Sequence, residues 1–416
     1  MASFISKKSS KSNRSKNSNK LSMRYIIMGV IGVACIALIA VAVISTLSGG
    51  DDGGEDDPDP GSVAGTPTPP PPTPQPTPDP EPDPEPDPEP DPDPDPEPNK
   101  DLYNPLTGMP MDEETARRRP LVVSIGNSTE SGVHPMNGIS RADIVYEMPV
   151  EGATTRMLAI YQDTASIRKV GGIRSARHYT VLIAESYDGI LIFSGGVTGE
   201  AEARARGIPF LDENTRVQVR DLDRIPGQRI ARLHSLVTTT ALVDRWLPEY
   251  SERRNFRLTH EDDYNLGLVF VDDGTPQNGG SADNFEIKFG IGKSSFLLYD
   301  DAKKTYGLRQ FASRRDLRDA NDNSLAAFTN VLILKTSIST IRQGPYAGAG
   351  RVDIVTIGSG EGYFINGGKY IEIEWHRATY SDPFSYTLKD GTVLELGIGR
   401  TYIALMSLER GEVIFG

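Results

Sequence analysis

The longest apolar run of the chain extends from Tyr25 to Leu47 and contains 23 residues without a single charge. A helix rises about 1.5 Å per residue, so a run of this length crosses a hydrocarbon core of about 30 Å. In lipid, a single segment satisfies its own backbone hydrogen bonds only as a helix. The pattern therefore predicts a transmembrane helix over residues 25–47.

The flanks of this run differ in charge and predict its orientation. Residues 1–24 carry seven Lys and Arg and no acidic residue, whereas residues 48–98 carry no Lys or Arg. The positive-inside rule then predicts a cytoplasmic tail over 1–24 and an extracytoplasmic C-terminal side. An alternative is a lipoprotein signal cleaved at Cys35, which follows Gly32-Val33-Ala34. Because 12 more uncharged residues follow Cys35, we favour the uncleaved anchor.

Residues 48–100 form an acidic, proline-rich stretch. From 66 to 98 proline occupies nearly every second position, and Asp or Glu fills most of the intervening positions after residue 78. Proline fixes φ and removes backbone donors, and the carboxylates repel one another. Both effects favour an extended polyproline II spacer of about 3.1 Å per residue, or about 100 Å for these 33 residues.

Residues 101–250 mix strand-like and helix-like patterns. Period-two or continuous apolar runs predict strands, and Ala-rich or capped segments predict helices. Ser175 stands where it can cap the first helix. The predicted strands cover 119–125, 142–150, 156–161 and 189–193, and the predicted helices cover 175–186, 198–206 and 238–247.

Residues 251–416 alternate almost entirely with period two, which is typical of a β-rich segment. Glycine-ending turns such as Asn366-Gly367-Gly368 and Lys389-Asp390-Gly391 separate the expected strands. We expect an α+β fold: a mixed α/β N-terminal part (101–250), followed by a β-rich meander or partial barrel (251–416).

Composition narrows the function classes. The net charge of −13 comes mainly from the spacer, and the folded part has no basic stripe of the kind that binds nucleic acid. The single cysteine lies in the predicted anchor, so the ectodomain has no disulfide. The five histidines show no pair at metal-ligand spacing, and no nucleophile elbow is present. We therefore predict no metal, no cofactor and no assigned catalytic residue.

The segment 171–177, GGIRSAR, is the most site-like part of the sequence. Two glycines precede a predicted helix start, and Arg174 and Arg177 stand three residues apart, where they can converge on a carboxylate or phosphate. The alternative is that these arginines pair with acidic residues of strand 142–150 and its end; our compromise is a structural Arg177 and an Arg174 that reaches a cleft. The candidate binding residues are Gly171, Gly172, Arg174, Ser175, Arg177, Glu147, Glu151 and His234.

Several runs together resemble the YerB-like family of bacterial extracytoplasmic proteins, a domain of unknown function. They are NPLTG at 104–108, Arg119-Pro120, ADIVYE at 142–147, VEGATTR at 150–156 and GGIRSAR at 171–177. The resemblance implies an α+β N-terminal part and a β-rich C-terminal part, and no established reaction. The chain departs from the family in its predicted anchor, where many relatives carry a lipidated cysteine. It also departs around Arg232-Leu233-His234-Ser235, where Pro and Asn usually flank the histidine.

These patterns favour a single-pass membrane protein whose ectodomain binds a cell-envelope glycan or a protein partner, with an oligomeric state that the sequence leaves open. The alternative is a cell-envelope hydrolase that uses carboxylates of the N-terminal part. A hydrolase requires two carboxylates facing each other across a cleft at about 5–10 Å.

Overall fold

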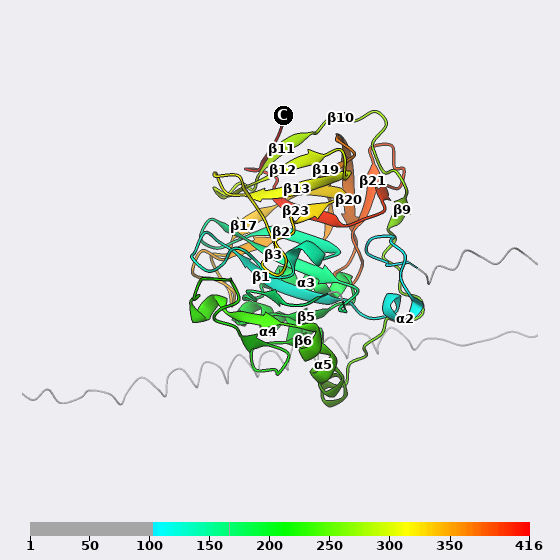
Figure 1. Ribbon diagram of the computed structural model, residues 1–416. Coiled ribbons are helices and arrows are strands. Elements are labelled where there is room, and N and C mark those ends of the chain that lie inside the picture. Colours follow the sequence, from blue (N-terminus) through cyan, green and yellow to red (C-terminus); the bar gives the residue numbers. More distant parts are fainter. Residues whose placement is uncertain (1–102, 166) are drawn as a thin grey trace, which may run out of the picture. The chain divides into compact units, whose positions relative to one another are not determined.

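The computed structural model describes residues 103–165 and 167–416 (Figure 1). The predicted cytoplasmic tail, transmembrane helix and spacer, 1–100, lie outside these residues. Within the described part, no helix has both the length and the apolar character needed to cross a membrane.

A large mixed sheet runs through the centre of the fold. Its strand order is β10-β20-β19-β16-β23-β2-β3-β1-β5-β6, and β21 pairs with β20. The pairs β16–β23, β23–β2, β1–β5 and β5–β6 are parallel and the other pairs are antiparallel. The strands are β1 (Leu121–Asn127), β2 (Ile144–Val150), β3 (Thr154–Tyr161), β5 (Ile190–Ile192), β6 (Phe210–Leu211), β10 (Gly280–Ser281), β16 (Asn330–Thr336), β19 (Gly358–Asn366), β20 (Lys369–Arg377), β21 (Ser385–Leu388) and β23 (Thr401–Ser407).

A second, antiparallel sheet has the order β14-β13-β12-β11-β24, with β15 on β13. In Figure 1 its strands β11, β12 and β13 lie together near β23. Its strands are β11 (Asn284–Lys288), β12 (Ser294–Asp300), β13 (Thr305–Gln310), β14 (Arg315–Asp316), β15 (Ala327–Phe328) and β24 (Glu412–Phe415). The smaller sheets contain β4 (Val170–Gly171), β7 (Val219–Arg220) and β8 (Leu236–Thr238); β9 (Val269–Val271) and β22 (Glu395–Gly397); and β17 (Ile338–Thr340) and β18 (Val352–Ile354).

The α-helices of the described part are α2 (Glu113–Ala116), α3 (His178–Ser186), α4 (Val197–Arg206) and α5 (Thr240–Arg254). Helix α3 begins later than predicted: Arg177, not Ser175, is its N-cap. Helix α5 continues through Pro248 to Arg254 although the prediction ended it at 247. Proline removes one backbone donor there, but the rest of the helix keeps its bonds, and Tyr250 is buried beyond it.

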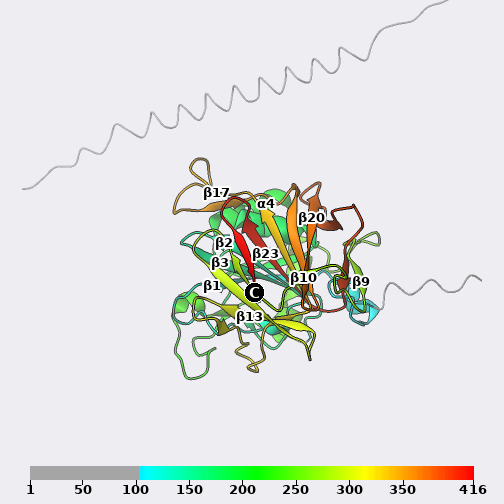
Figure 2. The same ribbon diagram turned by 90° about the horizontal axis from the view of Figure 1, so that it is seen from above.

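Two hydrophobic cores lie on opposite faces of the central sheet. Successive strand residues point to opposite faces, and Val123 and Val145 accordingly pack in one core while Val122 and Tyr146 pack in the other. The first core includes residues of the second sheet and of α5, and the second includes α3. Figure 2 shows the central strands from above, with α4 on the side away from β13. The central sheet is therefore covered by a second sheet on one face and by α3 and α4 on the other.

The β-rich character of the described part is confirmed, and the helices in this part are few. The meander β11–β12–β13 is present in the C-terminal part. The rest of that part is not a separate meander or partial barrel, because β16, β19, β20 and β23 join the central sheet through the parallel pair β23–β2. The glycine-rich run 358–362 forms the start of β19, since it pairs in register with the end of β20.

Candidate anion-binding site

The segment between β4 and α3 is held by backbone hydrogen bonds on both sides. Arg174 N donates to Ser124 O of β1 at 2.9 Å, and Arg174 O accepts from Ser194 N after β5 at 3.1 Å. These two bonds fix the main chain of Arg174 beside the central sheet, so the direction of its guanidinium depends on the side-chain conformation alone.

The register of β1 and β3 brings Arg174 close to Arg156. Gly126 of β1 stands directly opposite Arg156 of β3, and opposite residues of an antiparallel pair share a face. A Cβ on Gly126 would lie 2.8 Å from Cγ of Arg174. Glycine at 126 therefore leaves the space that the Arg174 side chain occupies, on the face of the sheet where Arg156 also lies.

Arg156 is a buried cation without a carboxylate partner. It is 7% exposed, and no carboxylate among the described residues lies within 4.0 Å of its guanidinium. Its Nη1 donates to Ser175 O at 2.5 Å, while its Nε is buried and has no partner. Burial, followed by the nearby Arg177 and Arg174, lowers the pKa of Arg156 to about 9. The side chain still carries its charge at neutral pH.

His234 and Glu130 position the guanidinium of Arg174. Arg174 Nη1 lies 2.7 Å from His234 Nδ1, and His234 Nε2 lies 3.1 Å from Glu130 Oε2. Because the arginine only donates, Nδ1 must accept and Nε2 must carry the proton. Burial and the charge of Arg174 lower the pKa of His234, which fits this neutral tautomer. The imidazole thus holds Arg174 without cancelling its charge.

The guanidinium of Arg174 interacts only weakly with carboxylates of the described residues. Its nearest carboxylate, that of Glu130, is 3.9 Å from Nη1 and is 60% exposed. The other guanidinium N–H groups of Arg174 make no hydrogen bond to a described residue, and its side chain is 20% exposed. Arg174 can therefore offer donors to a ligand from solvent.

Arg177 has a different environment. Its guanidinium forms a bidentate pair with Glu151, in which Nε donates to Oε2 at 3.0 Å and Nη2 donates to Oε1. Nη1 donates to Ala176 O, and the backbone N–H donates to Thr180 Oγ1 in the first turn of α3. Its donors are largely used within the protein, as expected of a side chain that holds the helix start to the end of β2.

The two glycines at 171 and 172 approach the protein's own backbone. A Cβ on Gly171 would lie 2.6 Å from Leu236 O, and one on Gly172 would lie 2.5 Å from His234 O. We predicted from the sequence that this pair admits a ligand. In the structure the space is taken by the segment 234–237, and that close contact is what places His234 beside Arg174.

Glu147 lies on the opposite face of the central sheet from Arg156. It is fully buried and accepts hydrogen bonds from Asn127, Thr155, Ser295, Gln310 and Tyr402, with Lys293 Nζ at 3.6 Å. Period-two alternation separates it from the arginines, so Glu147 does not belong to this cluster. It joins the central sheet to the second sheet instead.

The N-terminus of α4 adjoins Ser175. Gly195 and Gly196 have φ angles of +73° and +97°, which glycine adopts without strain. A Cβ on Gly196 would lie 2.3 Å from Ala176 O, and one on Gly195 would lie 3.3 Å from Ser175 Oγ. No side chain of the described residues caps the N-terminus of this ten-residue helix. The start of α4 therefore packs against Ser175 and Ala176, and the N–H of Gly195 just before the helix donates to Glu213 Oε2 at 2.7 Å.

We call the cluster of Arg156, Arg174, Ser175 and His234 the arginine site. The last three were candidates from the sequence alone, whereas Arg156 and Glu130 were not. The position of Arg156 within the apolar strand TTRMLAIY could have indicated a site, because a charged side chain on a buried strand requires a partner. Glu130 lies in an irregular segment and had no such signal.

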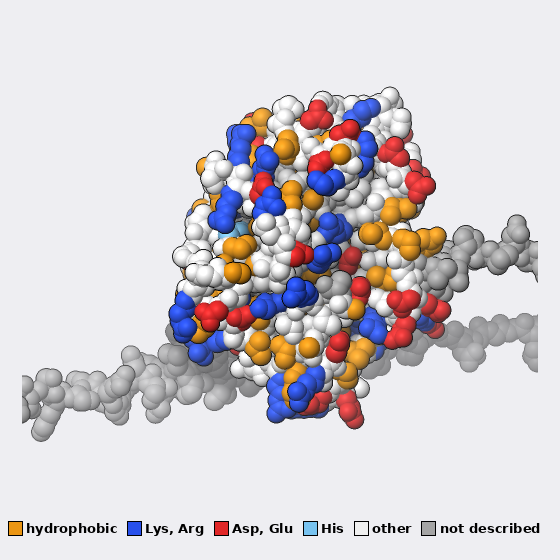
Figure 3. All heavy atoms as spheres, viewed as in Figure 1, with side chains coloured by type: hydrophobic (Ala, Val, Ile, Leu, Met, Phe, Trp, Pro, Cys, Tyr) orange, Lys and Arg blue, Asp and Glu red, His pale blue; other side chains and the backbone are white. Residues whose placement is uncertain are grey.

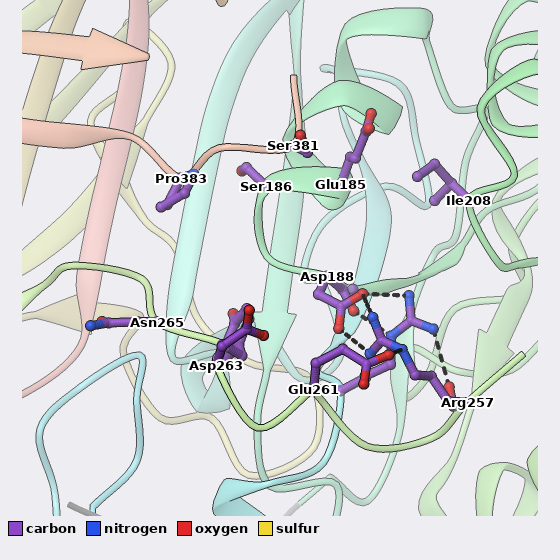
Figure 4. A pocket seen from close by; sticks show the side chains of 13 residues that line it. Glu185, Ser186, Asp188, Ile208, Arg257, Glu261, Asp263, Asn265, Ser381 and Pro383 are labelled. Atoms are coloured by element: carbon purple, nitrogen blue, oxygen red, sulfur yellow. Dashed lines mark hydrogen bonds and ion pairs between the residues drawn. The ribbon is translucent and has the colours of Figure 1, made fainter. Parts of the chain in front are cut away.

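The hydrolase hypothesis gains no support from Asp188, a carboxylate in the wall of a cavity that shares no lining residue with the arginine site. This cavity of about 290 Å³ is lined by Glu185, Asp188, Glu261 and Asp263 (Figure 4). Burial raises the pKa of Asp188, but hydrogen bonds from His260 and Arg257 outweigh burial and lower it overall. A general acid needs a raised pKa, so Asp188 is unsuited to that role. Among the described residues no group of three or more potential ligands is placed to hold a metal ion.

Comparisons with known proteins agree with the fold. Residues 106–249 match the N-terminal domain, and residues 285–403 the C-terminal domain, of a family described as protein of unknown function (DUF3048). The chain is 27% identical over 327 residues to "Putative lipoprotein YerB" of Bacillus subtilis (strain 168), covering 75% of this chain and 90% of that protein. The crystal structure of YerB superposes with a TM-score of 0.61 at 24% identity, covering 75% of this chain and 99% of the other. The protein described here therefore belongs to the DUF3048 family, with both of its domains present in one chain.

Proposed function

We propose that the folded part is a binding module at the cell envelope that recognises an anionic group, a carboxylate or a phosphate, at the arginine site. The observation that carries the proposal is Arg156, a buried guanidinium that has no described carboxylate within 4.0 Å and whose Nε has no partner among the described residues. A buried charge is retained in proteins when something compensates it. An anionic ligand held by Arg156 and Arg174 would supply that compensation.

The surroundings of the site favour an anion over a neutral ligand. Arg174 presents free donors to solvent beside Arg156, a second guanidinium that makes no ion pair with a described residue. Guanidinium groups bind carboxylates and phosphates through paired, charge-assisted hydrogen bonds. On the face seen in Figure 3, basic and acidic side chains are interspersed, so the proposed recognition is local and does not rest on a broad basic surface.

We expect the Arg174→Ala variant of the full-length protein to lose affinity for glycerol 3-phosphate or succinate by about tenfold or more. Hydrogen bonds to a charged group contribute about 1.5–3 kcal/mol, which corresponds to about 10- to 100-fold in Kd. Isothermal titration calorimetry at low salt measures the change, and comparison of the two ligands distinguishes phosphate from carboxylate recognition.

The matched control is Arg229→Ala, which removes the same charge from an exposed side chain that makes no ion pair or hydrogen bond to a described residue. Its affinity should stay within about twofold of the wild type, since the effect of an exposed surface charge is screened by solvent and salt. Equal losses in both variants, or no saturable binding of either anion to the wild type, would refute the proposal.

We also propose that this module stands outside the cell membrane, attached through the segment from Tyr25 to Leu47. The uninterrupted apolar run, its basic N-terminal flank and the relation to a protein named as a lipoprotein support this location. External protease on intact protoplasts should remove the folded part and leave residues 1–24 protected. Mass spectrometry should find Cys35 within an uncleaved chain; a mature N-terminus at a lipidated Cys35 would replace the helix anchor by a lipid anchor.

A further inference from the structure

A second cavity lies apart from the arginine site and has the opposite electrostatic character. Its volume is about 590 Å³, and it lies between the start of the described chain and the segment 260–270. Its lining includes the aromatic side chains of Tyr103, Tyr264 and Phe270, and its charged lining residues are three carboxylates and one guanidinium: Glu261, Asp262, Asp263 and Arg117. An anion would be repelled here.

His260 supplies an unpartnered acceptor in the wall of this cavity. The residue is 8% exposed, and its Nδ1 lies 3.0 Å from Asp188 Oδ2. Since the carboxylate accepts, Nδ1 carries the proton and Nε2 keeps a lone pair. Nε2 is buried and has no partner in the described structure. Burial lowers the pKa of His260 despite Asp188, which keeps this ring neutral.

Asp263 is the carboxylate left unpaired at the rim. Asp262 pairs with Arg117 at 2.5 Å, and Glu261 pairs with Arg257 at 2.7 Å. Asp263 forms no ion pair or hydrogen bond with a described residue, and Figure 4 shows it apart from the network around Asp188. The cavity thus combines a free negative charge, a neutral acceptor and aromatic rings.

We propose that this cavity binds a primary ammonium group carried on an apolar body. Asp263 would pair with the ammonium, the rings of Tyr264 and Phe270 would contact the cation and its apolar stem, and His260 Nε2 would accept one N–H. The Tyr264 ring stacks on the face of His260 with centroids 3.5 Å apart and leaves the plane of the imidazole, in which the Nε2 lone pair lies; because Nε2 is buried, contact with it requires a local shift of the cavity wall. The site is separate from the arginine site, and either proposal can fail without the other.

The probe is the phenethylammonium ion, with 2-phenylethanol as its uncharged isostere, titrated into the full-length protein by calorimetry. We expect saturable binding with a Kd of about 1 mM, a value reasonable for so small a ligand. The Asp263→Asn variant should bind the amine about fivefold or more weakly than the wild type does. The wild type should bind 2-phenylethanol about as weakly as this variant binds the amine. The matched control, Asp262→Asn, removes a carboxylate that Arg117 already neutralises and should change the Kd by less than about twofold.

The role of His260 is tested with His260→Asn, whose amide can keep the donor to Asp188 while the Nε2 acceptor is lost. This variant should bind the amine about threefold or more weakly. In the wild type, the ¹⁵N shift of His260 Nε2 should move on titration with the amine and not with the alcohol, a readout that does not depend on how the variant folds. Equal binding of amine and alcohol, or an unchanged Kd in Asp263→Asn, would overturn the proposal.

Discussion

Replacing Glu147 by alanine is expected to lower the free energy of unfolding by about 3–5 kcal/mol, the usual cost of leaving the partner of a buried ion pair alone. Glu147 is 0% exposed and lies 3.6 Å from the ammonium of Lys293, which is itself 7% exposed. Burial lowers the pKa of Lys293, whereas Glu147 raises it. Without the carboxylate, this lysine and the other donors around it lose their common acceptor.

The position of the pair makes the effect global. Glu147 belongs to β2 of the central sheet, and Lys293 directly precedes β12 of the second sheet. Ser295 of β12 and Gln310 of β13 donate to the same carboxylate. The network therefore connects the two sheets through polar contacts inside an apolar core, and its loss should weaken their packing as a unit.

Urea unfolding of the full-length protein measures this loss. The double variant Glu147→Leu with Lys293→Met removes both charges and should recover at least half of the lost stability, because no isolated charge remains. The Glu147→Ala variant, while folded, should bind anions at the arginine site as the wild type does, since the carboxylate faces the other side of the sheet. Two outcomes would contradict the role of this buried pair. One is a loss of stability below about 1 kcal/mol in Glu147→Ala; the other is a double variant whose loss of stability equals the sum of the losses in Glu147→Leu and Lys293→Met alone.

Arg156→Met is expected to have the opposite effect on stability: a gain of about 1–4 kcal/mol, together with loss of anion binding. Replacing a buried charge by an apolar side chain of similar length removes its desolvation cost. The pKa of Arg156 in the folded protein, about 9, lies below its ordinary value. The folded state therefore binds this proton more weakly than the unfolded state, and the cost is fully present below about pH 9 and decreases as the pH rises above it.

The experiment compares unfolding and binding at pH 7 in the same variant. Arg177→Met serves as the contrast, because Arg177 has a carboxylate partner in Glu151. Its loss leaves that carboxylate alone and should lower stability by about 1–3 kcal/mol. A stabilised Arg156→Met variant with unchanged anion affinity would show that the buried charge serves no ligand. A strongly destabilised one would show that its hydrogen bond to Ser175 O holds the segment in place.

The sequence by itself determined the β-rich character of the folded part and the alternation along β2, because side chains on a strand alternate with a strict period of two. It also singled out Arg174 and Arg177 beside a helix start. It placed the C-terminal strands in a separate meander or partial barrel, since local patterns do not reveal that β23 pairs with β2 across more than 250 residues.

Only the tertiary structure decided which charged side chains meet. Strand register put Arg156 opposite Gly126 and thereby beside Arg174, and the contact of Gly172 with the carbonyl of His234 brought in the histidine. The same alternation sent Glu147 to the other face, towards Lys293. Pairing in this fold depends on contacts between segments far apart in the chain. The residue types that carry charge were therefore visible in the sequence. Their partners were not, and neither was the lack of a carboxylate within 4.0 Å of Arg156 among the described residues.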